Sequence, residues 1–283
     1  KNLGESRARL SPRANITALD TVLVRPLPWA DSDRLVYVSE TVYGNPASAG
    51  VGHFHDWAEQ ARTFEGMTAF AGRTFNLTDG DAARVAGLRV TPGYFQVAYA
   101  PPALGRYFRP DETMASRVAV LSHPLWQTRY EGDSSIIGRQ IALNGELHTV
   151  VGVAGPEYVL SEFSPRVYAP LDFPPPEDRT NYYSHFLTVI GKLRPGVTMA
   201  QARDDIVRVT EDIRRGNPNA MKNRRATVMG MSERLIGEGA QLLVGTWAAV
   251  GGNRSLLDQA GLGNALVDRW KRFFRFGSCG FRL

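Results

Sequence analysis

A serine beside a histidine is the first feature of the sequence that could do chemistry. Ser122 and His123 directly follow an apolar run, in the stretch VAVLSHPLWQTRY. Nucleophilic catalysis needs a hydrogen bond between the two side chains and a third group that orients the imidazole, whereas neighbouring helical residues do not face each other. The G-x-S-x-G turn of a nucleophile elbow is missing as well. We therefore interpret Ser122 as a helix N-cap, with Pro124 in the first turn.

A second serine, Ser134, lies in the segment GDSS, which is similar to the Gly-Asp-Ser nucleophile block of some hydrolases. That block normally follows the first strand of a chain, but here it follows a predicted helix in mid-chain. No Asp-x-x-His motif lies downstream, where the remaining histidines are His148 and His185. We interpret Asp133 as a turn residue. A serine esterase that uses Ser122 or Ser134 remains the alternative function.

Two histidines, His53 and His55, form an H-x-H pair that would hold a metal ion if the backbone were extended. The apolar residues from Phe54 to Ala61 recur at helical spacing, however, and a helix places the two histidines on nearly opposite faces. His148 and His185 lie in predicted strands, with no spacing for further ligands. We therefore assign no metal ligand and expect no cofactor or catalytic residue. A metal-binding domain stays as a further alternative.

The charge balance argues against a nucleic-acid-binding protein. The 33 basic and 28 acidic residues give a net charge of +5, and the basic excess lies near the two ends rather than on one element with aromatic residues. The single cysteine, Cys279, excludes an internal disulfide and a zinc site of cysteines. No segment reaches the roughly 18 apolar residues of a membrane span. We expect the chain as given to be soluble.

Two local patterns predict particular elements. Asn144-Gly145 is the preferred pair of a tight hairpin turn, because both central residues need positive φ. Thr198 and Gln201 form a capping box at the start of an amphipathic helix, and Gly216 marks its end.

The element order predicts an α+β fold. Strand–helix–strand patterns occupy 35–77 and 185–231, with a β-rich block between them. We expect the two βαβ halves, within 25–93 and 181–235, to form one lobe in a single sheet. Residues 94–180 would then be an inserted, mainly β lobe.

An ordered series of segments resembles a known family. The segments are VLVRPLPWADSDRLVYV (22–38), FHDW (54–57), RTFEGMTAF (62–70), FNLT (75–78), ALGRYFRPDE (103–112), VAVLSHPLWQTRY (118–130), IIGRQIALNGELHTVVGV (136–153) and LTVIGKLRPGVTMAQA (187–202). Over about residues 22–238 this ordered set is similar to the extracytoplasmic core domain of MacB-type ABC transporter permeases, nearest to the large bacterial branch of FtsX-like permeases. The resemblance implies a porter-like lobe with an inserted, mainly β lobe.

The resemblance implies a domain without catalytic residues on the extracytoplasmic, periplasmic face of the bacterial inner membrane. It implies a permease dimer that works with a separate cytoplasmic ABC ATPase. The domain would pass the ATPase's motion to a periplasmic adaptor or substrate protein, for efflux or for lipoprotein or peptide release. Contact with the membrane would come only through helices that this chain lacks.

Both ends depart from the family pattern. Residues 1–24 are polar where the family has an apolar helix, and residues 239–283 resemble nothing in the family. The hypothesis for these atypical ends is a truncated or frame-shifted permease gene, and the alternative is a soluble relative with new termini.

Proline-rich loops and aromatic residues taken to be exposed are the candidate partner contacts, since exposed apolar patches tend to be interfaces. Ordinary loop packing is the competing interpretation. The candidates are Pro101, Pro102, Tyr107, Pro174, Pro175, Tyr182 and Tyr183.

Overall fold

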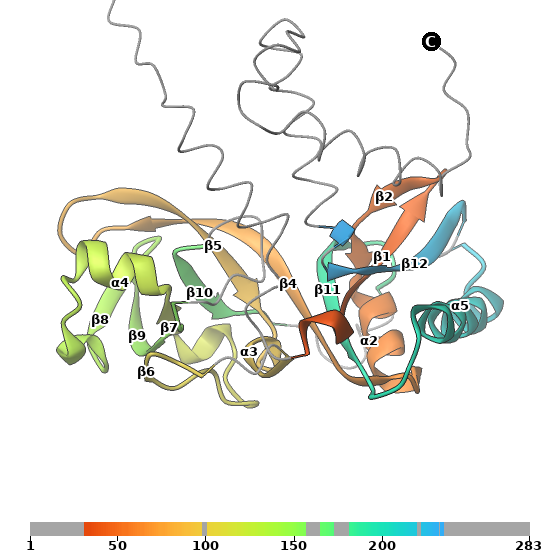
Figure 1. The fold of residues 1–283 in the computed structure, drawn as a ribbon. Coiled ribbons are helices and arrows are strands. Elements are labelled where there is room, and N and C mark those ends of the chain that lie inside the picture. Colours follow the sequence, from red (N-terminus) through yellow and green to blue (C-terminus); the bar gives the residue numbers. More distant parts are fainter. Residues whose placement is uncertain are drawn as a thin grey trace, which may run out of the picture. The chain divides into compact units, whose positions relative to one another are not determined.

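A mixed β-sheet runs through the part of the chain that the computed structural model describes (Figure 1). Its strand order is β12-β1-β11-β4-β5-β10-β7-β9-β6, with β2, β3 and β8 paired beside this path. The described residues are 31–97, 101–156, 165–172, 181–219, 222–231 and 233–234. The strands are β1 (Leu35–Val42), β2 (Asn45–Ala47), β3 (Ala49–Gly50), β4 (Phe64–Leu77), β5 (Ala83–Val90), β6 (Leu104–Gly105), β7 (Val118–Leu121), β8 (Gln140–Leu143), β9 (Glu146–Val153), β10 (Val167–Pro170), β11 (His185–Leu193) and β12 (Arg224–Gly230).

The helices are short apart from one. α5 is an amphipathic helix of 18 residues whose buried side chains include Ile206, Val209 and Ile213. The α-helices are α2 (Val51–Gln60), α3 (Tyr94–Val97), α4 (His123–Arg129) and α5 (Met199–Gly216), and the 3-10 turns are η1 (Ser32–Arg34), η2 (Met114–Ser116) and η3 (Ser134–Ile136).

The two strand–helix–strand halves interlock. In the first half, β1-α2-β4, the strand β11 lies between β1 and β4 and pairs antiparallel with both. In the second half, β11-α5-β12, the strand β1 lies between β11 and β12 and pairs antiparallel with both. Each half therefore holds a strand of the other between its own two strands. The predicted α+β fold with a split βαβ arrangement is confirmed.

Two hydrophobic clusters lie along this sheet, and β4 contributes to both. Phe64 and Ala69 belong to the cluster that packs under α2 and α5. Phe75 and Leu77 belong to the cluster formed with β7, β8, β9 and α4. β4 is one continuous strand of 14 residues.

The local predictions are confirmed where a few neighbouring residues decide the backbone. Asn144 and Gly145 both have positive φ, 54° and 84°, in the β8–β9 turn. The Thr198 hydroxyl accepts the N–H of Gln201, whose side chain accepts the N–H of Thr198, so the capping box is complete.

The predicted lobe boundaries, 25–93 with 181–235 and 94–180, stay a prediction. The described residues all belong to one compact unit, Leu27–Arg234. The atypical ends, 1–24 and 239–283, lie outside the described residues.

Asp205 connects α5 by hydrogen bonds to the turn between α2 and β4. Its Oδ2 accepts the N–H groups of Arg62 and Thr63, at 2.6 and 2.9 Å, and the Thr63 hydroxyl, at 2.9 Å. Arg208 donates to Oδ1 at 2.7 Å. Burial raises the pKa of Asp205, but the bonds from Arg208, Arg62 and Thr63 outweigh it and hold the pKa below its ordinary value.

We expect Asp205→Asn to lower the free energy of unfolding at pH 7 by about 2 kcal/mol, because the amide is a weaker acceptor than the carboxylate. A lowered pKa in the folded state means that this stability is present above pH ~4 and is lost as the pH falls through the folded pKa. The variant should therefore approach wild type below that window, as measured by urea unfolding at several pH values. Asp204→Asn, at the exposed neighbouring position, is the matched control, and a constant difference at all pH values would contradict the role of the charge.

Candidate functional site

Ser122 is placed as a cap and not as a nucleophile. Its Oγ accepts the N–H of Leu125 at 3.3 Å, at the N-terminus of α4. The ring of His123 meets the edge of Trp126, with centroids 5.4 Å apart. The capping interpretation is confirmed, and the geometry gives no Ser–His hydrogen bond between these two residues.

The GDSS segment forms a turn. Asp133 caps η3 by accepting the N–H and the hydroxyl of Ser135, and the bonds to Ser135 lower the pKa of Asp133. Ser134 is the first residue of η3. The interpretation of Asp133 as a turn residue is confirmed.

Replacing Ser122 by alanine is expected to lower the free energy of unfolding by about 1 kcal/mol, whereas Ser122→Gly should cost only a few tenths. The physical reason is loss of the acceptor for the Leu125 N–H. Chemical denaturation measures both variants. An ester-hydrolysis assay on the same proteins should give equal, negligible rates, and a rate that falls only in the variants would support the esterase alternative.

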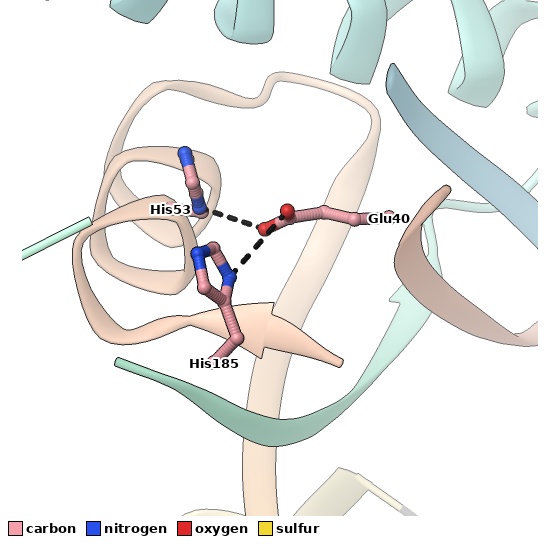
Figure 2. A group of neighbouring side chains, drawn as sticks. All are labelled: Glu40, His53 and His185. Atoms are coloured by element: carbon pink, nitrogen blue, oxygen red, sulfur yellow. Dashed lines mark ion pairs between the residues drawn. The ribbon is translucent and has the colours of Figure 1, made fainter. Parts of the chain in front are cut away.

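The H-x-H pair is separated by the helix, as predicted. His53 is fully buried and His55 is half-buried, both on α2. His53 lies instead beside Glu40 of β1 and His185 of β11 (Figure 2). The structure thus assembles a buried polar group that the sequence analysis did not find.

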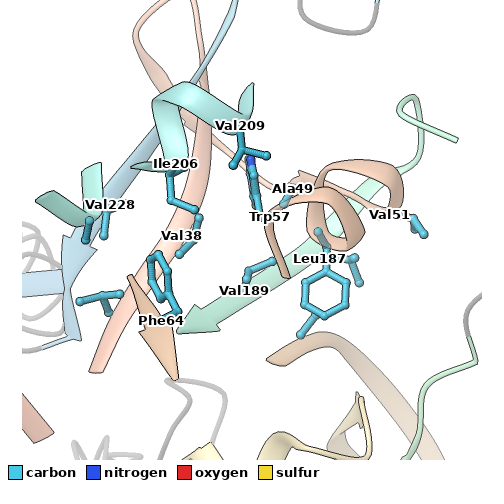
Figure 3. Close-up of a cluster of buried hydrophobic side chains, with 14 of the residues drawn as sticks. Val38, Ala49, Val51, Trp57, Phe64, Leu187, Val189, Ile206, Val209 and Val228 are labelled. Carbon is cyan, nitrogen blue, oxygen red and sulfur yellow. The ribbon is translucent and has the colours of Figure 1, made fainter. Parts of the chain in front are cut away.

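Each member of this group occupies a position in an apolar row. Alternation along β1 puts Glu40 on the face of Val36 and Val38, and alternation along β11 puts His185 on the face of Leu187 and Val189. His53 lies one turn before Trp57 on α2, and their rings stack with centroids 5.9 Å apart. The polar cluster therefore adjoins the hydrophobic cluster under α2 and α5. Figure 3 shows side chains of that hydrophobic cluster.

We refer to Glu40, His53, His185 and Arg224 as the Glu40 cluster. Nδ1 of His53 lies 2.7 Å from Oε1 of Glu40, and Nδ1 of His185 lies 3.6 Å from Oε2 (Figure 2). Arg224 of β12 donates to Oε2 at 2.8 Å, and the N–H of Gly50 donates to Oε1 at 3.2 Å. The carboxylate and the His53 side chain are fully buried.

Charge in the cluster is set by its contacts. Burial raises the pKa of Glu40, but the contacts with His53 and Arg224 and the Gly50 N–H outweigh it, so the pKa lies below its ordinary value. Burial lowers the pKa of His185, and Arg224 and His53 add to this against the attraction of Glu40. At neutral pH the group contains an ionised carboxylate and a neutral His185 ring.

Gly50 leaves space for this arrangement. It is the N-cap residue of α2, and a Cβ at this position would lie 2.9 Å from Nδ1 of His53 and 3.3 Å from Cε1 of His185. Its φ of −80° is an ordinary one, so the requirement for glycine is steric.

The candidate partner contacts differ in exposure. Pro101 is exposed and Pro102 is half-buried. Tyr107 is half-buried, with its ring stacked on Phe95 at a centroid distance of 4.0 Å, and burial raises its pKa to about 12. Pro174 and Pro175 lie outside the described residues.

The two neighbouring tyrosines are not equivalent. Tyr183 is 65% exposed. Tyr182 was expected to be exposed, but it is half-buried because its hydroxyl donates to Asp56 at 2.6 Å and its ring lies against His53. The expectation for Tyr182 was therefore wrong.

Among the described helices, each falls short of the length and apolar character that crossing a membrane requires.

Comparison with known proteins gives one family and several solved structures of similar fold. The sequence model of the family described as MacB-like periplasmic core domain matches residues 17–209, more than half of the chain. No protein with curated annotation is significantly similar in sequence.

Two solved structures share the fold. One is a domain of a protein described as a permease from Porphyromonas gingivalis, with a TM-score of 0.56 and 15% identity over 71% of this chain and 92% of that one. The other is the periplasmic region of MacB from Actinobacillus actinomycetemcomitans, with a TM-score of 0.53 and 14% identity over 74% of this chain and 94% of that one. At these identities the likeness concerns the fold alone.

Proposed function

Because this chain belongs to the family of MacB-like periplasmic core domains, we propose that it transmits the motion of an ABC ATPase to a partner on the periplasmic side. The general context of the family is transport by an ABC permease. In this proposal the chain acts in a permease dimer with a separate cytoplasmic ATPase. It also docks an adaptor or substrate protein, for efflux or for lipoprotein or peptide release.

The proposed transmission of motion is supported by the position at which the chain enters the sheet, at β1, and leaves it, at β12. β1 and β12 are antiparallel neighbours, with Val36 opposite Gly230. The segment that leads into β1 and the segment that follows β12 therefore meet the sheet side by side. A displacement of either segment would act directly on two adjacent strands.

An ion-pair network anchors the start of β1. Arg34 donates to Glu65 at 3.0 Å and to the carbonyl of Leu193 at 2.8 Å. Lys192 and Arg34 both donate to Asp31, at 3.1 and 2.6 Å. The network ties the entry of β1 to the ends of β4 and β11, and β4 then runs on into the second hydrophobic cluster. Force applied at Arg34 thus has a continuous hydrogen-bonded route into the sheet.

The test is a distance measurement in the full permease assembled with its ATPase in lipid nanodiscs. Spin labels are placed at Leu147, an exposed residue of β9, in both protomers after Cys279→Ser has removed the native thiol. We expect trapping with ATP and vanadate to shift the distance between the labels, and Arg34→Met to reduce the shift. Arg215→Met, which removes an exposed ion pair with Asp212, is the matched control. A distance unaffected by ATP would contradict transmission.

Docking is tested at Tyr183. Tyr183→Ser should weaken cross-linking to the periplasmic partner, while Tyr182→Phe, which removes only the hydroxyl bonded to Asp56, should not. Equal cross-linking in both variants would remove Tyr183 from the contact surface.

A further inference from the structure

Three side chains of the Glu40 cluster have the chemistry of a metal-binding site. Glu40, His53 and His185 each offer one ligand atom, and these atoms all lie within 4.8 Å of one another (Figure 2). Two imidazoles and a carboxylate form a ligand set that suits zinc, with a fourth position left for water. We propose that Glu40, His53 and His185 bind a zinc ion.

The spacing of the ligand atoms supports this assignment. With zinc–ligand bonds near 2.0–2.1 Å, neighbouring ligands of a tetrahedral ion lie about 3.4 Å apart. The pair from His185 and Glu40 is at 3.6 Å, and the pair from His53 and Glu40 is at 2.7 Å. All three ligand atoms lie within 4.8 Å of one another, and side-chain rotations that bring them to tetrahedral spacing would admit the ion.

The ring nitrogens give an independent reason. Nδ1 and Nε2 of His53 and Nδ1 of His185 are buried and make no hydrogen bond of regular geometry. The 2.7 Å separation of His53 Nδ1 from Oε1 of Glu40 is an ion-pair contact. Buried polar atoms without a partner are costly, and a cation between the two Nδ1 atoms and the carboxylate would provide a partner for both Nδ1 atoms.

The surrounding groups resemble the outer shell of a metal site. Metal-bound carboxylates and imidazoles usually make further hydrogen bonds that fix their orientation. The Gly50 N–H and Arg224 donate to the two oxygens of Glu40, and the carbonyl of Ser48 is a partner of the His185 ring.

The positive charge of Arg224 disfavours the binding of a second cation beside Glu40. Its guanidinium lies 2.8 Å from Oε2 of Glu40, and its side chain is 20% exposed, so it can turn toward solvent when the ion binds. Because the two cations compete for Glu40, removing Arg224 should strengthen zinc binding. If Arg224 and Glu40 formed only a structural ion pair, removing Arg224 should not strengthen zinc binding.

The site opens on one side. Glu40 and His53 are fully buried, while the His185 side chain is 16% exposed, so an ion enters past His185. The bound ion would join β1, α2 and β11 in the C-terminal half of β1, where Glu40 lies opposite Ala226 of β12, and would stabilise the folded state by mass action.

Zinc binding is measured on the full chain after treatment with EDTA and dialysis, by titration calorimetry with ZnCl2 and by thermal unfolding with and without zinc. We expect one zinc ion per chain and a higher unfolding midpoint with zinc. His185→Asn and Glu40→Gln should each weaken binding by about 100-fold or more, since they remove direct ligands and loss of outer-shell partners alone costs 10–100-fold. His148→Asn, on β9 outside the cluster, is the matched control and should bind as wild type does.

Two further variants separate ligation from folding. Arg224→Gln should tighten binding about tenfold, because it removes a neighbouring positive charge. Gly50→Ala should weaken binding through the clash with His53, while Gly72→Ala, with open space around its Cβ position, should not. Failure to bind zinc, or affinity equal in wild type and His185→Asn, would overturn the proposal. The proposed transport function would stand in either case.

Discussion

Replacing Trp57 by alanine is expected to lower the free energy of unfolding by about 4 kcal/mol, as for other buried aromatic residues. The Trp57 side chain is fully buried between α2, α5 and the sheet (Figure 3). Its indole N–H donates to the Thr210 hydroxyl at 3.0 Å, which in turn donates to the carbonyl of Ile206 at 2.7 Å. Alanine would leave a large cavity and remove the donor to the Thr210 hydroxyl, where α2 packs against α5.

Trp57→Phe separates these two contributions. It keeps an aromatic ring but removes the N–H donor, so we expect a loss of about 1–2 kcal/mol from the hydrogen bond and imperfect packing. Urea unfolding followed by circular dichroism measures both variants without relying on tryptophan fluorescence. Tyr43→Ala, at a residue that is 78% exposed, should change stability by less than about 0.5 kcal/mol. Equal losses for Trp57→Phe and Trp57→Ala would contradict the packing argument.

Replacing Glu40 by alanine in zinc-free buffer is expected to cost about 3 kcal/mol. The change leaves Arg224 and the Gly50 N–H without their acceptor in a buried setting, and removal of one partner from a buried ion pair is strongly destabilising. Glu40→Gln should cost less, because an amide oxygen can still accept one of the two bonds. Chemical denaturation in EDTA gives both values.

The exposed pair of Arg117 and Glu146, 3.5 Å apart, is the control for Glu40. Glu146→Ala should change the free energy of unfolding by less than about 1 kcal/mol, as is usual for surface ion pairs. A similar loss at the two positions would show that burial of Glu40 does not determine the cost.

Several elements could be predicted because neighbouring residues decide them. Ser122 and Thr198 cap their helices through bonds to N–H groups three residues later, and Asn144-Gly145 sets a hairpin turn through its own backbone angles. The fold class followed from the order of such elements together with the family resemblance. These features depend on short stretches of chain, so a linear pattern contains the information.

The Glu40 cluster depends on pairing between distant strands, which no linear spacing shows. Glu40 and His185 meet because β11 lies beside β1, with Tyr37 opposite Ile190. In the sequence each ligand lies in an apolar row, and His53 was paired with His55 because the two are close along the chain. Tyr182 was expected to be exposed for a similar reason, since its partner Asp56 belongs to another segment. The available clue was an ionisable residue at a core-facing strand position, Glu40 after Val36 and Val38.

The interlocked strand order has a consequence for biosynthesis. β1 and β4 emerge early from the ribosome, but the strand that pairs with both, β11, is made only after the whole segment from β5 to β10. Until then β1 and β4 each present an open edge, and open edges invite pairing with other chains. Long-range pairings of this kind also form slowly. The segment between β4 and β11 thus has time to fold first, and the newly made chain depends on protection from aggregation until β11 and β12 arrive.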